Sequence, residues 1–104
     1  MEGEKDIKSG PANLHRGLEN VGGKLTLTNE QLVFVPHGFN FQRATSEIPL
    51  SQITDIRLCW TKLLTFIPLL PNSFLVATSQ GKEYRFVVFN RKSWVTSINE
   101  HRGA

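Results

Sequence analysis

The stretch GGKLTLTNEQLVFVP, residues 22–36, decides the fold. Apolar and polar residues alternate over 25–28, and a second apolar run over 32–35 follows a short polar turn. Two such runs, separated by Asn and other polar residues, predict a β-hairpin. The side chains that this hairpin is expected to contribute to a core are Leu25, Leu27, Leu32 and Phe34.

The same signals recur on both sides of the hairpin. The further strands that they predict are 12–18, 45–48, 53–61, 72–78 and 82–89. Glycines predict a turn at 20–23 and another at Gly81, where a tight turn needs positive φ. After Asn90, a residue type that favours helix N-termini, the spacing of apolar residues predicts an amphipathic helix over 91–101.

These elements predict a mainly β fold, in which the C-terminal helix closes a partly open barrel of about seven antiparallel strands. Trp94 would plug the open end of this barrel. A ubiquitin-like or swapped-sheet α+β fold is the structural alternative. The other side chains expected in the core are Trp60, Phe74, Tyr84, Phe86 and Ile98.

Length and charge set limits on function. A chain of 104 residues has the size of one domain, which we place at 11–102 after a polar, flexible tail at 1–10. The net charge of +3 comes from scattered cations, whereas nucleic-acid binders carry a dense basic stripe, so no nucleic-acid partner is expected. The polar N-terminus and the single Cys59 favour a cytoplasmic chain or one at a membrane surface.

Six groups of residues carry a family resemblance. They are Gly22-Gly23-Lys24-Leu25 with Leu27-Thr28-Asn29, Leu32-Val33-Phe34, Ile48-Pro49-Leu50-Ser51-Gln52-Ile53, Pro71-Asn72-Ser73-Phe74, Gly81-Lys82-Glu83-Tyr84-Arg85-Phe86-Val87-Val88, and Arg91 with Trp94. In this order and spacing they resemble a GRAM domain, a member of the pleckstrin-homology-like superfold. The resemblance covers roughly residues 11–98. It implies a barrel-like sheet with a C-terminal helix, and a role in binding membrane lipids or proteins without catalysis.

The first predicted loop departs from the phosphoinositide-binding members of that superfold. The resemblance implies several Lys or Arg residues in and around this loop in such members. Here the loop at 17–23 contains Glu19, and the only cation nearby is Lys24. Because phosphate recognition requires converging cationic donors, we do not expect a specific inositol-phosphate pocket at this position.

The segment 63–70 is unusually apolar for a connection between two strands. One interpretation is insertion into a membrane interface or a partner, with nearby cations facing anionic headgroups. The other is that half of these side chains fold back into the core and extend a strand. The residues of the proposed membrane or partner contact are Arg57, Lys62, Leu63, Leu64, Phe66 and Ile67.

Two later strands are apolar on both faces, which indicates either double cover or a partly exposed surface. Phe86 and Val88 alternate with Val87 and Phe89, and 74–77 has the same character. Such faces favour a homodimer or a protein partner, unless the N-terminal segment and the helix cover them. Two cations in the first turn of the helix, Arg91 and Lys92, either contact an anion or form a solvated face.

No catalytic or metal-binding pattern is present in the sequence. His15, His37 and His101 are far apart without metal-ligand spacing, and Cys59 has no companion thiol. We therefore expect a non-catalytic protein without a metal or cofactor. The leading interpretation is a module that docks on an anionic phospholipid surface. The alternatives are a protein-interaction or dimerisation module, and an enzyme that uses one of the histidines.

Overall fold

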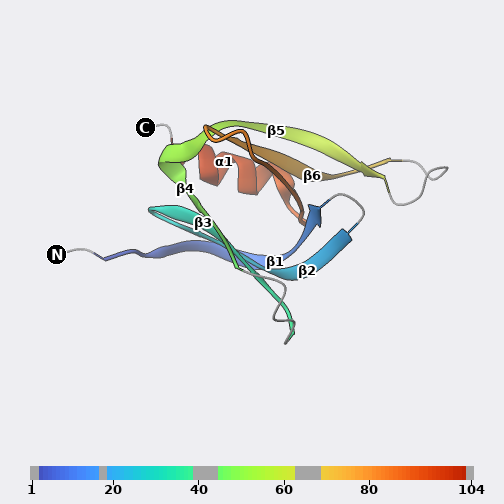
Figure 1. Ribbon diagram of the computed structural model, residues 1–104, viewed down its shortest axis with the longest axis horizontal. Coiled ribbons are helices and arrows are strands. Elements are labelled where there is room, and N and C mark those ends of the chain that lie inside the picture. The colour runs from blue at the N-terminus through green and yellow to red at the C-terminus, as the bar shows by residue number, and fades with distance from the viewer. Residues whose placement is uncertain (1–2, 17–18, 39–44, 63–68, 103–104) are drawn as a thin grey trace.

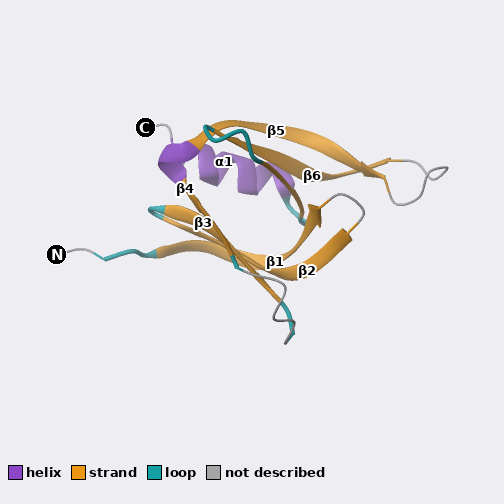
Figure 2. Cartoon of the chain, in the orientation of Figure 1, coloured by secondary structure: helices purple, strands orange, loops and turns teal. Residues whose placement is uncertain are grey.

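The computed structural model describes residues 3–16, 19–38, 45–62 and 69–102. Figure 2 shows strands that form one antiparallel sheet and a helix at the C-terminal end. The sheet order is β4-β3-β2-β1-β7-β6-β5, and its two ends are not paired with each other. The prediction of seven antiparallel strands and one C-terminal helix is confirmed. The elements are β1 (Asp6–Arg16), β2 (Glu19–Thr28), β3 (Gln31–Pro36), β4 (Ser46–Pro49), a 3₁₀ turn (Leu50–Gln52), β5 (Ile53–Lys62), β6 (Leu69–Thr78), β7 (Glu83–Val87) and α1 (Arg91–Arg102).

The sheet bends so that its two halves face each other across the core. Figure 1 shows β1, β2 and β3 in one layer and β5 and β6 in the other. Three phenylalanines from three strands meet between these layers. The ring centroid of Phe86 lies 5.9 Å from that of Phe34 and 5.7 Å from that of Phe74. All three are buried, so the contact joins the two halves of the sheet.

The helix α1 closes the open side of the bent sheet. Its buried residues are Trp94 and Ile98, which are four positions apart and therefore lie on one face of the helix. At its C-terminal end, the Arg102 guanidinium donates a hydrogen bond of 3.2 Å to the carbonyl of Ile53 in β5. Trp94 is 4% exposed, in the place expected for a plug.

The turn between β2 and β3 fastens the N-terminal segment to the sheet. The Thr28 hydroxyl accepts hydrogen bonds from the amides of Glu30 and Gln31 and donates one of 2.6 Å to the Glu4 carboxylate. Lys5 donates its amide to the Asn29 side chain, and the Asn29 amide donates to the Lys5 carbonyl. Hydrogen bonds from Thr28, and then from Gln31, hold the pKa of Glu4 below its usual value.

Two sequence-based boundaries differ from the structure. β1 begins at Asp6, so residues 6–10, assigned to a flexible tail, belong to the sheet. Their polar side chains are compatible with a strand because β2 supplies the backbone partners. The turn expected at 20–23 is also wrong, because β2 begins at Glu19. Gly22 and Gly23 pair with Asn13 and Ala12 inside the sheet, where glycine permits close strand approach instead of a turn.

The side chains expected in the core have three outcomes. Tyr84 is partly buried and packs against the core, and the side chain of Trp60 lies outside the described part of the structure. The expected core residues that are buried are Leu25, Leu27, Leu32, Phe34, Phe74, Phe86, Trp94 and Ile98.

Gly23→Ala tests the close approach of β2 and β3. A Cβ at this position would overlap the Val35 carbonyl oxygen and lie 2.9 Å from the Cα of Pro36. We expect a loss of roughly 1–3 kcal/mol in the free energy of unfolding, measured by urea denaturation. Gly10→Ala is the control, since its Cβ would lie 3.8 Å from Trp94, an ordinary contact. Equal stability of the two variants would contradict the prediction.

Candidate functional site

The hairpin of β5 and β6 extends past the rest of the sheet. The last pair between β6 and β7 is Ser73 with Val87, whereas β5 and β6 continue to the pair Lys62 with Leu69. We call residues 60–62 and 69–72 the β5–β6 arm. Figure 1 shows this arm at one end of the long axis of the molecule. The arm carries the segment 63–68, whose Leu63, Leu64, Phe66 and Ile67 lie outside the described residues, as does the Lys62 side chain.

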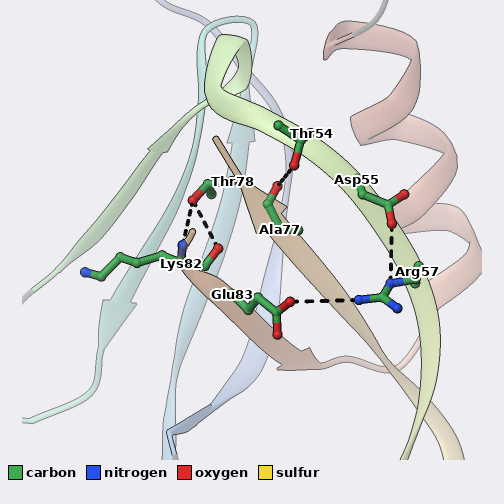
Figure 3. Close-up of polar contacts among 7 residues, drawn as sticks. All are labelled: Thr54, Asp55, Arg57, Ala77, Thr78, Lys82 and Glu83. Atoms are coloured by element: carbon green, nitrogen blue, oxygen red, sulfur yellow. Dashed lines mark hydrogen bonds and ion pairs between the residues drawn. The ribbon is translucent and has the colours of Figure 1, made fainter. Parts of the chain in front are cut away.

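Arg57, the other residue of the predicted membrane contact, lies between two carboxylates (Figure 3). Its guanidinium is 3.3 Å from the Asp55 carboxylate on β5 and 3.9 Å from the Glu83 carboxylate on β7. All three side chains are more than half exposed, so each pair contributes little to stability. The arrangement nevertheless offsets the charge of Arg57, which makes it a weaker partner for an anionic headgroup than its sequence position indicates.

The two cations at the start of α1 have different surroundings. The Arg91 guanidinium is 3.5 Å from the Ser73 carbonyl on β6, in a partly buried contact that connects the helix to the sheet. Lys92 is exposed. Neighbouring helical residues point in different directions, so the structure does not bring these two cations together as one site.

The sequence reasoning missed a pair of a histidine and an arginine on the outer face of the sheet. His15 on β1 is directly opposite Arg85 on β7, and both are partly buried. Burial, and then the neighbouring Arg85 charge, hold the pKa of His15 below its ordinary value. Seventy positions separate the two residues in the chain, so no local sequence signal indicates their contact.

A cavity of about 350 Å³ opens beside His15. The Lys82 amine, at its rim, is 5.8 Å from the centre of the Tyr84 ring. A backbone turn positions Lys82, because its amide donates to the Thr78 hydroxyl, which in turn donates to the Lys82 carbonyl (Figure 3). Gly81 in this turn has φ of 84°, as the sequence predicts. The residues that line the cavity are Leu14, His15, Ser46, Lys82, Glu83 and Tyr84.

The corner between β7 and α1 carries the most exposed large apolar side chain among the described residues. Phe89 is 89% exposed, and the apolar alternation of 86–89 is the sequence signal that indicates it. A second cavity, of about 370 Å³, lies next to it between β1 and the end of β7. This corner therefore presents an apolar surface that the described part of the chain does not cover.

Two further observations concern metal and membrane chemistry. Within the described ranges, no three His, Cys, Asp or Glu side chains come close enough to hold a metal ion. The helix in this part of the chain is too short and too polar to cross a membrane.

Several solved structures share this architecture. The C-terminal domain of an unknown protein from Leishmania infantum matches with a TM-score of 0.74 and 19% identity, over 95% of this chain and 84% of that one. The DH/PH domains of p115-RhoGEF match with a TM-score of 0.73 and 16% identity, and the match covers 97% of this chain but only 31% of that one. The Slm1-PH domain in complex with inositol-4-phosphate matches with a TM-score of 0.62 and 16% identity, and the match covers 94% of this chain and 95% of that one.

The comparisons at sequence level found nothing: no protein-family model and no curated protein matches the chain. The structural likenesses, all at low identity, show that the chain has the pleckstrin-homology fold.

The pKa of His15 gives a prediction with a definite sign. The unfolded chain binds this proton more readily than the folded chain, so His15 contributes stability above about pH 6.5 that is lost as the pH falls through the lower folded pKa. Arg85→Gln removes the secondary cause, so an NMR titration should show a raised pKa that stays below 6.5. Arg57→Gln, which removes a cation on β5, three strands from His15 in the sheet, is the control. A His15 pKa at or above 6.5 in the unsubstituted chain would contradict the prediction.

Proposed function

We propose that this chain is a non-catalytic binding module, a GRAM-like form of the pleckstrin-homology fold, that docks on an anionic phospholipid surface on the cytoplasmic side. The docking element is the apolar segment 63–67 with Lys62 at its base. No cofactor takes part. The observation that carries this proposal is the projection of the β5–β6 arm beyond the end of β7.

The β5–β6 arm, which carries the apolar segment 63–67, extends beyond the end of β7. The pairing of β6 with β7 ends at Ser73, so the strand that flanks the rest of β6 is missing beside the arm. In this proposal the apolar side chains of 63–67 enter the membrane interface. Each large apolar side chain contributes roughly 1.5–3 kcal/mol when fully buried, and a Lys near an anionic surface adds about 1 kcal/mol.

A membrane ligand also agrees with what is known of a similar fold. The Slm1-PH domain has been solved in complex with inositol-4-phosphate. Inositol-4-phosphate carries an anionic phosphate group, and for this chain we propose only that an anionic phosphate group is bound, on the surface of a phospholipid membrane. The headgroup contact would differ from the one that the sequence predicts, in which Arg57 also takes part, because Arg57 is already paired with Asp55 and Glu83. Lys62 is then the expected cation of the arm.

A protein partner or a second copy of the chain is the other candidate function. The observation that favours it is the exposed Phe89 beside the second cavity. This surface is separate in the chain from segment 63–67, so variants can distinguish the two functions.

Vesicle co-sedimentation tests the membrane proposal. We expect the chain to sediment with phosphatidylcholine vesicles that contain phosphatidylserine and not with phosphatidylcholine alone, and binding should weaken as salt is raised. Leu64→Glu and Phe66→Glu should abolish binding, because a carboxylate at either position would have to enter the apolar interface.

Phe89→Glu is the matched control, since it adds the same charge at a largely exposed aromatic position. It should leave vesicle binding unchanged. The membrane proposal fails if no binding occurs at low salt. It also fails if Phe89→Glu removes binding while the two arm variants retain it.

A further inference from the structure

A groove separates β1 from the corner where β7 passes into α1. It is the cavity of about 370 Å³ beside Phe89. Its walls are mainly apolar, and Phe89 is 89% exposed at its edge. The residues that line it are Pro11, Ala12, Asn13, Val87, Val88 and Phe89.

One wall of the groove is a strand edge without a strand partner. β1 pairs with β2 over its whole length, from Asp6 to Arg16, but with β7 only from Asn13 to His15. In the described part of the sheet, residues 6–12 therefore have a strand neighbour on one side only. The first turn of α1 contacts the side chains of this stretch, because the Lys8 amine donates a hydrogen bond of 3.0 Å to the Ser93 hydroxyl and a Cβ on Gly10 would lie 3.8 Å from Trp94. The backbone edge has no strand beside it there, and such an edge can accept one through backbone hydrogen bonds.

Pro11 indicates which backbone groups face the groove. Proline has no N–H, so it fits a ladder with its nitrogen directed away from the paired strand, here β2. Because backbone groups alternate between the two sides of an antiparallel strand, the carbonyl of Pro11 and both backbone groups of Ser9 also face the open side. An incoming strand would continue the ladder that β7 leaves at Val87.

Pro11 also limits how strongly the edge alone can bind. It removes one donor from the ladder, which is a common way to protect an edge against nonspecific pairing. A bound segment must therefore gain affinity from side chains as well. The groove offers an apolar cavity for this purpose beside Val87 and Phe89.

The charges around the groove are mainly positive. The described 6–13, 22–24 and 87–93 contain four cations and one carboxylate, Asp6, which lies at the far end of the edge from the cavity. Lys24 lies across the ladder from Pro11 and is exposed, as is Lys92 in the first turn of α1. Within the described residues neither of them forms an ion pair. A ligand with carboxylates beside an apolar side chain would complement this surface.

We propose that this groove binds an extended, acidic segment of a partner protein, which adds as a strand to the open edge of β1 and places an apolar side chain in the cavity beside Phe89. The proposal does not rest on membrane docking by the β5–β6 arm. The two surfaces involve different residues, so either proposal can fail without the other.

The test uses three synthetic decapeptides with the isotope-labelled full chain. The first alternates Glu and Val around a central Phe, the second has Lys in place of Glu, and the third is the first with N-methylated amides on one edge. We expect NMR shift changes at 9–13 and 87–92 with the first peptide only. The second peptide lacks charge complementarity, and the third cannot form the ladder.

Two groove variants and one control measure the contribution of side chains. Phe89→Ala should weaken binding of the first peptide at least tenfold, and it should fold normally because this side chain is solvated. Lys24→Glu should weaken it roughly threefold to tenfold, the range for an exposed ion pair that becomes repulsive. Leu58→Ala, at an exposed apolar position two strands from β7, should leave binding unchanged.

Several outcomes would overturn the proposal. They are the absence of shift changes in the groove at millimolar peptide, equal binding of the lysine peptide, and equal binding of the N-methylated peptide. If anionic vesicles broaden the resonances of 87–92 while the first peptide has no effect, the groove is a membrane contact instead. Unchanged affinity of Phe89→Ala would also reject the proposed binding mode.

Discussion

The contact of Phe86 with Phe34 and Phe74 is the interaction on which the rest of the structure depends. Phe34 belongs to one half of the bent sheet and Phe74 to the other, and Phe86 touches both. Aromatic rings of this size bury enough apolar surface to hold two sheet halves together in a small domain. Trp94 and Ile98 of α1 then cover the side that the sheet leaves open.

The candidate binding surfaces follow from the way α1 closes the core. β7 has five residues, whereas β6 has ten and β1 has eleven, because the chain leaves the sheet after Val87 and begins the helix at Arg91. Both neighbours of β7 therefore continue without it. On one side this leaves the β5–β6 arm, and on the other it leaves the open edge of β1. One short strand thus accounts for both surfaces.

Charge is distributed differently on the two sides of β7. On the outer face toward β5, Arg57 is offset by Asp55 and Glu83. On the side toward β1, burial and then the charge of the adjacent Arg85 hold the pKa of His15 below its ordinary value. The net charge of the chain is small, so the surface that attracts an anion depends on which cations have carboxylates nearby.

The sequence by itself determined the approximate positions of the strands along the chain and the buried faces of β2 and β3, because side-chain alternation records which face packs inward. It also indicated segment 63–67 by its apolar composition. Only the tertiary structure decided that Gly23 lies inside a strand, that Arg57 has two acidic neighbours and that His15 meets Arg85. These features depend on register between strands that are distant in the chain, and register follows from packing across the whole sheet, which a local pattern of residues does not contain.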